Sequence, residues 1–273
     1  MNIPFGQRTL LKGAPFAIYR LEGYISNIYI VEYQNDLLLF DSGAACDART
    51  IELFLQKTLH RSPADIKLAF VSHIHPDHAG GIQSLRGKYQ IAVAAHPNID
   101  LWYAGIGGFI QQQIDSVMML QVGLRSHKKL ARVGFDRMVQ PDFVLEDKDP
   151  LPFFDDWLTV FVPGHTLHDV VIYNQTARVL YAGDCICNVN GRFLSPLPLI
   201  FKDTMRQSYD KLAALDVDTI LLAHGEPIGP PLAKHIFADM KQSLDLPPTW
   251  MTRQVNFFSH YSPEVWKNKR KYS

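Results

Sequence analysis

His73-Ile74-His75-Pro76-Asp77-His78 places four potential metal ligands within six residues. The segment before it, Lys67–Ser72, is apolar enough to predict a buried strand, and Ala79-Gly80-Gly81 follows directly. Because successive side chains of a strand point to opposite faces, clustered ligands belong on the loop that leaves the strand. Imidazole nitrogens together with a carboxylate suit zinc, iron or manganese rather than calcium, which prefers oxygen ligands alone. The alternative is a polar turn that happens to be rich in histidine.

Three later segments have the same form, an apolar strand that ends in a candidate ligand. They are Thr159–Val162 before His165, Val179–Ala182 before Asp184, and Ile220–Ala223 before His224. Phe40-Asp41-Ser42-Gly43 has this form near the start of the chain. In α/β architectures ligands gather beyond the carboxyl ends of strands, so these segments can converge on the histidine stretch. Their recurrence favours a metal site over a chance histidine-rich turn.

The composition is that of a globular protein that buries a sizeable core, with 47% hydrophobic and 20% charged residues among 273. Lys plus Arg equals Asp plus Glu at 27 each, so no global field favours nucleic acid or an anionic membrane. The basic run Lys267–Lys271 is expected to be a solvated, frayed end, with a partner-binding tail as the alternative.

The sequence contains no pattern that targets a membrane or an oxidising compartment. The first residues, MNIPFGQRTLLKG, lack a basic segment followed by an apolar core, so no secretory signal is predicted. No run of eighteen apolar residues predicts a membrane span. Three cysteines cannot form a disulfide framework. We therefore expect a cytoplasmic protein that acts on a small molecule, without nucleic acid or membrane partners.

Short apolar runs alternate with helical patterns along most of the chain. Strands are expected at 16–21, 25–33, 37–40, 67–72, 91–95, 158–162, 170–173, 179–182 and 219–222. Asp47 is expected to cap a helix that follows the third strand, and Asp203 one that runs to about Leu215. Strands in each half followed by helices predict an α/β protein, an αββα sandwich of two mixed β-sheets flanked by helices. A doubly wound sheet is the alternative.

A helical insertion at 98–148 interrupts the rhythm of strands. Within it Ile110, Ile114, Val117, Met118 and Gln121 fall on one helical face, which predicts one or two helices followed by a loop. An amphipathic packing helix is the simpler interpretation, and a lid or dimer contact is the sharper one. No linker divides the chain, so residues 1–273 are expected to form a single domain, and a homodimer stays open.

Taken together, these segments resemble the metallo-β-lactamase superfamily of metal hydrolases. The matching residues are the histidine stretch, His165 in PGHT, Asp184 in AGD, His224 in AHG and Asp41 in FDSG, in the family's order. The resemblance implies two divalent metal ions, preferably zinc, with iron or manganese as alternatives. Its ligand sets are His73, His75 and His165 for the first ion, Asp77, His78 and His224 for the second, and Asp184 as the bridge. Asp41 would brace the ligand loops without binding an ion.

In that family a hydroxide between two ions attacks a carbonyl carbon or a phosphorus, and Asp77 is our candidate for the catalytic residue that orients it. The resemblance implies a hydrolase, but it does not identify the substrate. A thioester, lactone or other small ester is preferred, because the apolar stretch after Arg192 and Phe193 suits an acyl chain. His168, Arg192 and Phe193 are therefore the candidate substrate contacts. A phosphodiesterase, a mononuclear-iron persulfide dioxygenase and a non-catalytic, metal-stapled metabolite sensor are the alternatives.

Overall fold

The computed structural model describes residues 15–272, and the N-terminal stretch without a secretory pattern lies outside them. The described chain forms two compact units. Unit 1 comprises residues 15–95, 113–144 and 152–154, and unit 2 comprises residues 96–112, 145–151 and 155–272. This division does not test the expectation of a single domain, which stays a prediction.

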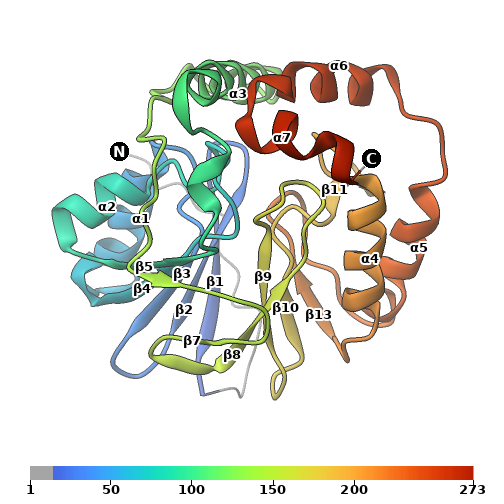
Figure 1. Cartoon of the computed structure of the whole chain (residues 1–273). Helices are drawn as coiled ribbons and strands as arrows, with labels where there is room; N and C mark the ends of the chain where they lie inside the picture. Colours follow the sequence, from blue (N-terminus) through green and yellow to red (C-terminus); the bar gives the residue numbers. More distant parts are fainter. Residues whose placement is uncertain (1–14, 273) are drawn as a thin grey trace. The chain divides into compact units, whose positions relative to one another are not determined.

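Unit 1 contains a six-stranded mixed sheet whose strands follow one another in chain order (Figure 1). The strands are β1 (Ala17–Glu22), β2 (Asn27–Glu32), β3 (Leu37–Phe40), β4 (Ile66–Phe70), β5 (Ala92–Ala95) and β6 (Phe143–Val144). The first three are antiparallel neighbours, and β3 to β6 are parallel. All four residues of β3 are buried, as expected for an apolar strand covered on both faces. The parallel part brings the carboxyl ends of β3 and β4 to one edge.

Short helices connect these strands in unit 1: α1 (Asp47–Phe54), the π-helical turn η1 (Leu55–Leu59), the 3-10 turn η2 (Pro63–Asp65) and α2 (Ile82–Tyr89). The prediction that Asp47 caps α1 is wrong, because Cys46 holds the N-cap position. The Asp47 carboxylate instead accepts hydrogen bonds from the N–H groups of Tyr24 and Ala44, both at 2.9 Å. It therefore fixes the loop before the helix.

Unit 2 contains a five-stranded mixed sheet in the order β13-β10-β9-β8-β7 and a separate two-stranded ribbon. The strands are β7 (Pro150–Leu151), β8 (Phe154–Phe161), β9 (Val170–Asn174), β10 (Val179–Tyr181) and β13 (Thr219–Leu221), with β11 (Cys187–Val189) and β12 (Arg192–Leu194) in the ribbon. β10 and β13 are parallel, so their carboxyl ends lie at the same edge. Asp184 and His224 follow those two ends in the sequence.

The helices of unit 2 fill most of its C-terminal half. They are η3 (Ile99–Leu101), α4 (Lys202–Ala213), η4 (Leu232–Lys234), α5 (Ile236–Ser243), α6 (Trp250–Phe258), η5 (Ser259–Tyr261) and α7 (Pro263–Tyr272). The prediction that Asp203 caps α4 is wrong, because Phe201 holds the N-cap and Asp203 lies in the first turn. The basic run 267–271 is not a frayed end, because it continues α7.

Helix α3 (Gly105–Arg125) lies within the predicted insertion, and a stretch without helix follows it to β6, as expected. Its polarity is the reverse of the packing helix that was predicted. Polar Gln111, Gln112 and Asp115 are buried, whereas Ile110 and Val117 are exposed. Apolar spacing alone therefore identified the helix but assigned the wrong face to the interior. Among the described residues, no helix combines the length and hydropathy that crossing a bilayer requires.

Candidate metal centre

The histidine stretch forms the loop that leaves β4, and backbone hydrogen bonds fix its shape. The N–H groups of His78 and Ala79 both donate to the carbonyl oxygen of His75, at 3.0 and 2.9 Å. Ser42 donates from its N–H and its Oγ to the carbonyl oxygen of His78, at 2.7 and 2.9 Å. Ser26 Oγ donates to the carbonyl oxygen of Asp77 at 2.5 Å. The loop after β3 therefore holds the loop after β4.

Gly80 explains why this turn can close. A Cβ atom at Gly80 would lie 2.2 Å from the carbonyl oxygen of Pro76 and 2.8 Å from the backbone nitrogen of Ala45. Real Cβ atoms do not approach backbone atoms so closely, so only glycine fits without moving the chain. Close packing within the loop thus explains why a glycine follows the ligands.

Asp41 is the main polar contact beneath the ligand loop. It is 1% exposed and has a φ of 53°, a left-handed conformation that Asp tolerates better than most residues. Its carboxylate accepts from Ser72 N–H at 2.8 Å and from Ser72 Oγ at 2.7 Å, and it lies 2.7 Å from His78 Nδ1. Because a carboxylate only accepts, His78 carries its proton on Nδ1. The lone pair of His78 is then on Nε2, the arrangement found in metal-binding histidines.

The other imidazoles of the histidine stretch lie close together beside His78. The ring centroid of His73 is 4.0 Å from that of His78 and 4.8 Å from that of His75. His73 Nδ1 lies 3.1 Å from Ser72 Oγ, and His78 Nε2 lies 3.8 Å from Asp77 Oδ2. All of these side chains are buried. Burying protonated imidazoles side by side would be costly, whereas a bound cation favours the neutral form of each ring.

In unit 2, Asp184 has an imidazole beside each of its two carboxylate oxygens. His165 Nε2 lies 3.6 Å from Asp184 Oδ2, and His224 Nε2 lies 3.3 Å from Asp184 Oδ1. His165 follows β8, and its Nδ1 donates to the carbonyl oxygen of Pro198 at 2.8 Å. A carbonyl oxygen only accepts, so the lone pair of His165 is on Nε2, toward Asp184.

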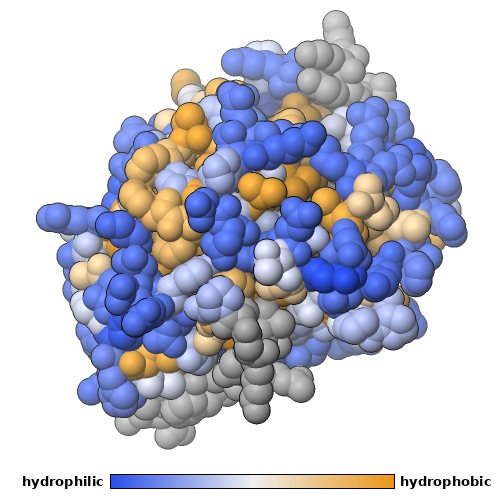
Figure 2. Space-filling view, turned by 90° about the horizontal axis from the view of Figure 1, so that it is seen from below, coloured by the Kyte–Doolittle hydropathy of each residue, from blue (hydrophilic) through white to orange (hydrophobic). Residues whose placement is uncertain are grey.

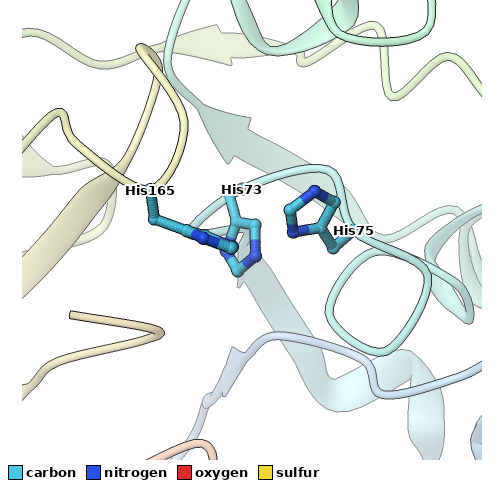
Figure 3. A group of neighbouring side chains, drawn as sticks. All are labelled: His73, His75 and His165. Carbon is cyan, nitrogen blue, oxygen red and sulfur yellow. The ribbon is translucent and has the colours of Figure 1, made fainter. Parts of the chain in front are cut away.

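Three groups of side chains have the chemistry and spacing to hold a metal ion, with ligand atoms within 4.8 Å of one another in each. The groups are His73, His75 and His165; His73, His78 and Asp184; and Asp77, His78 and His224. Figure 3 shows the rings of the first group lying next to one another. Imidazole and carboxylate ligands suit zinc, iron or manganese. The donor set and the orientation of its Nδ1 atoms therefore fit a metal site, and the first and third groups have the members that the resemblance implies for two ions.

Glu264 is a buried residue of unit 2 that the sequence analysis did not single out. Its carboxylate accepts from Leu167 N–H and lies 2.9 Å from His168 Nδ1, both in the loop that carries His165. Burial lowers the pKa of His168, but nearby carboxylates, Glu264 foremost and then Asp169 and Asp100, outweigh burial and raise that pKa above the ordinary value. No sequence signal distinguishes this glutamate from those on the surface, because its partners lie about a hundred residues earlier.

A second contact from the C-terminal helices reaches the same region. Asn256 of α6 accepts from Leu199 N–H at 2.9 Å and donates to the Leu199 carbonyl oxygen at 2.8 Å. Leu199 follows Pro198, whose carbonyl oxygen holds His165. Helices α6 and α7 thus fix both segments of backbone around this histidine.

The three candidate substrate contacts lie in different settings. His168 is fully buried beside Glu264 and near Trp102, with ring centroids 6.4 Å apart. Arg192 is exposed on β12, and Phe193 is partly buried against the apolar core of unit 2. No contact described here tests their role, so a substrate-binding function for these residues stays a prediction.

The sequence matches known proteins along most of its length. Residues 21–224 match the family model of the metallo-beta-lactamase superfamily. The chain is 24% identical over 249 residues to the probable metallo-hydrolase YflN of Bacillus subtilis (strain 168), covering 84% of this chain and 93% of that protein. It is 25% identical over 187 residues to the acyl-coenzyme A thioesterase MBLAC2 of Bos taurus, covering 64% of this chain and 63% of that protein.

Solved structures are similar over a comparable range. BJP-1, a subclass B3 metallo-beta-lactamase of Bradyrhizobium japonicum, has a TM-score of 0.63 at 18% identity, covering 89% of this chain and 93% of that one. This likeness shows the fold, and it confirms the predicted class of mixed sheets flanked by helices. With its histidine-rich groups and its match over residues 21–224, the chain belongs to the metallo-β-lactamase superfamily.

Proposed function

We propose that this protein is a metal-dependent hydrolase that cleaves a thioester, lactone or other small ester, with thioesters as the preferred class. The donor set supports the metal dependence, because three groups of imidazoles and carboxylates lie within coordinating reach. The thioester preference draws on the distant relatives that carry the name acyl-coenzyme A thioesterase. The apolar stretch after Phe193 supports an acyl substrate.

In this proposal each group has one role. His73, His75 and His165 would hold one ion, Asp77, His78 and His224 would hold the other, and Asp184 would serve both, with zinc preferred over iron or manganese. Bound ions of this kind lower the pKa of a water to about 7 and polarise a carbonyl oxygen. Asp41 keeps the Nδ1 proton on His78, and the Pro198 carbonyl oxygen keeps it on His165. These contacts orient both imidazoles before any substrate arrives.

The proposed reaction is hydrolysis at the acyl carbon. A water oxygen forms the new C–O bond, the C–S bond of the thioester breaks, and the proton that the water gives up passes to the leaving thiolate. Asp77 is the residue proposed to carry that proton, since its carboxylate is 3.8 Å from His78 Nε2 and its backbone is fixed by Ser26. An acid–base group must be held in place in this way to act within hydrogen-bond reach.

The observation that carries the proposal is the carboxylate of Asp184 with one imidazole Nε2 beside each oxygen. A carboxylate that presents its two oxygens to two sets of nitrogen ligands is suited to a pair of cations a few ångströms apart. A structural zinc site would instead close a single ion in four protein ligands.

The test measures metal content and turnover on the same preparation. The metal-loaded protein is assayed with an acyl-coenzyme A, a lactone and a phosphodiester, next to His75→Ala and the control His127→Ala. His127 is exposed and outside the three groups, so its removal should leave both readouts unchanged. We expect about two metal ions per chain, thioester hydrolysis, and loss of both a metal ion and at least a hundredfold in rate in His75→Ala.

Each alternative has its own outcome in this experiment. Turnover of the phosphodiester alone would show that the protein is a phosphodiesterase and not an ester hydrolase. A single iron with no hydrolysis would point to persulfide oxidation, and a metal-loaded chain inert to every substrate would favour a metabolite sensor.

A further inference from the structure

Helix α6 is a short helix that buries none of its residues in the chain. Among its nine residues none is buried, and it is anchored through Asn256 to Leu199 and through the buried Ser259 that follows it. Isolated helices of this length are unstable in water, and tertiary packing of an amphipathic face normally stabilises them. In Figure 1, α6 lies outside α7. Its apolar face therefore lacks the cover that short helices usually have.

The apolar face of α6 continues onto neighbouring elements of unit 2. Trp250, Met251, Phe257 and Phe258 recur at the spacing that places side chains on one side of a helix, and all four are exposed. In η5, Tyr261 is also exposed, and its backbone approaches Gly107 at the start of α3. We call the C-terminal apolar face the set Ile106, Phe109, Ile110, Trp250, Met251, Phe257, Phe258 and Tyr261.

The size of this face is suited to a protein interface. At roughly 200 Å² for a fully exposed large side chain, its eight residues present about 900 Å², given exposed fractions from 39% at Ile110 to 83% at Ile106. A stable interface buries about 800 Å² on each partner, and the largest apolar patch of a monomer is usually about 300–600 Å². Figure 2 shows one face of the molecule, on which groups of hydrophobic residues lie among hydrophilic ones.

We propose that a second copy of this chain covers the C-terminal apolar face, forming a symmetric dimer through α6. The face combines four aromatic side chains and a methionine on its two C-terminal elements, the residue types enriched at the centre of protein interfaces. Arg253 is the charged residue of α6, and the chain carries equal numbers of acidic and basic residues, so its net charge does not oppose self-association. A lipid-binding helix instead carries several Lys or Arg residues along its polar face. The basic run 267–271 of α7 is the feature that a lipid surface would use, and the test includes it.

The experiment compares the oligomeric state of the full chain with that of two double variants, by sedimentation velocity over a dilution series. Trp250→Ser with Phe257→Ser removes the centre of the face. Leu130→Ser with Val144→Ser is the matched control, because Leu130 is as exposed as Trp250 and both control residues lie outside the face. Circular dichroism confirms that each variant is folded, and binding to phosphatidylglycerol vesicles is measured in parallel.

The wild type and the control variant should sediment as dimers, and the α6 variant should need at least a hundredfold higher concentration to dimerise. A monomeric wild type, or an α6 variant that dimerises as well as the wild type, would overturn the proposal. A monomeric wild type that binds the vesicles and loses this binding in the α6 variant would assign the face to a lipid surface instead. None of these outcomes depends on hydrolase activity, so the dimer proposal can be refuted while the proposed function stands.

Discussion

Between Ser72 and Gly81 the chain buries polar side chains, whereas along α6 it exposes apolar ones. In the histidine loop each imidazole and carboxylate is removed from water, and nearby groups such as Asp41 and Ser42 hold it in place. In α6 the apolar residues stay in water although a short helix gains its stability by burying them. Both arrangements cost free energy in the isolated chain. The difference teaches that the first region has its supporting contacts within the fold, while the second lacks them there and would gain them in the proposed dimer.

Removing the support of the histidine loop should give the largest effect. Asp41→Ala leaves Ser72 N–H, Ser72 Oγ and His78 Nδ1 without their buried acceptor and places alanine in a left-handed conformation. We expect a loss of about 4 kcal/mol in the free energy of unfolding. Guanidinium unfolding of the metal-free protein measures it.

Asp41→Asn sharpens this result. Asparagine tolerates the same φ and can still accept from Ser72 N–H, but it cannot serve as a charged acceptor for His78. It should lose about half as much stability as Asp41→Ala and still weaken metal binding about tenfold or more. Asp239→Ala, an exposed position in α5, is the control and should change neither quantity. Equal unfolding midpoints for wild type and Asp41→Ala would remove Asp41 from the support of the loop.

Glu264 supports the other half of the ligand set from α7. Glu264→Gln removes the charge beside the fully buried His168 and weakens the contact with Leu167 N–H. Breaking such a buried pair should cost about 3 kcal/mol. Because the pKa of His168 is raised in the folded state, the contribution of the pair is present below pH 6.5 and declines as the pH rises through the folded pKa.

The stability difference between wild type and Glu264→Gln should therefore shrink at alkaline pH. Denaturant midpoints for the two proteins at several pH values measure it. Glu146→Gln, at an exposed glutamate, is the control and should match the wild type throughout. A difference that stays constant or grows with pH would contradict the assigned pairing.

His96 gives a smaller effect with the opposite dependence on pH. Burial and the nearby His168 lower its pKa to about 4, and its Nδ1 accepts from Asn98 N–H at 3.1 Å. The unfolded chain then binds more protons than the folded one between about pH 4 and 6.5, so stability is lost as the pH falls through this window. At pH 4.5 we expect His96→Gln to have lost about 2 kcal/mol less of its free energy of unfolding than the wild type. His127→Gln should lose as much as the wild type in the same urea titrations.

The sequence singled out the members of all three groups because each candidate follows the end of an apolar strand, although their binding of metal stays a prediction. His165, Asp184 and His224 are recognisable from a few residues around each of them. Glu264 and Asn256 were missed because their partners lie far away in the chain, and a local pattern carries no information about such contacts. Contacts that depend on the tertiary fold are therefore the part of the site that sequence patterns do not reveal.

The fold divides in the same way. Strands with a run of apolar residues, such as β3 and β9, were predicted to within one residue. The two- and three-residue strands β6, β7, β11 and β12 were not predicted, because they lack the apolar run that marks the equally short β10 and β13. In α3 the helical spacing of apolar residues correctly predicted a helix, but Gln111 and Asp115 are buried instead of Ile110 and Val117. The hydrophobicity of a helix face therefore predicts which face is buried only where the fold does not bury polar side chains.

Exposed residues of α6 should give the smallest effect on the folding of a single chain. Phe257 is 67% exposed, and its ring contacts the exposed Phe258 and His260. Because an exposed side chain removes little area from water, Phe257→Ser should change the free energy of unfolding of the monomer by no more than about 0.5 kcal/mol.

Unfolding is measured at a protein concentration low enough to dissociate any dimer. If the stability of the wild type rises with protein concentration while that of Phe257→Ser does not, the free energy lost by the variant belongs to association. A loss of about 2 kcal/mol or more at the lowest concentration would instead mean that Phe257 is packed within its own chain, and the contrast between α6 and the histidine loop would be wrong.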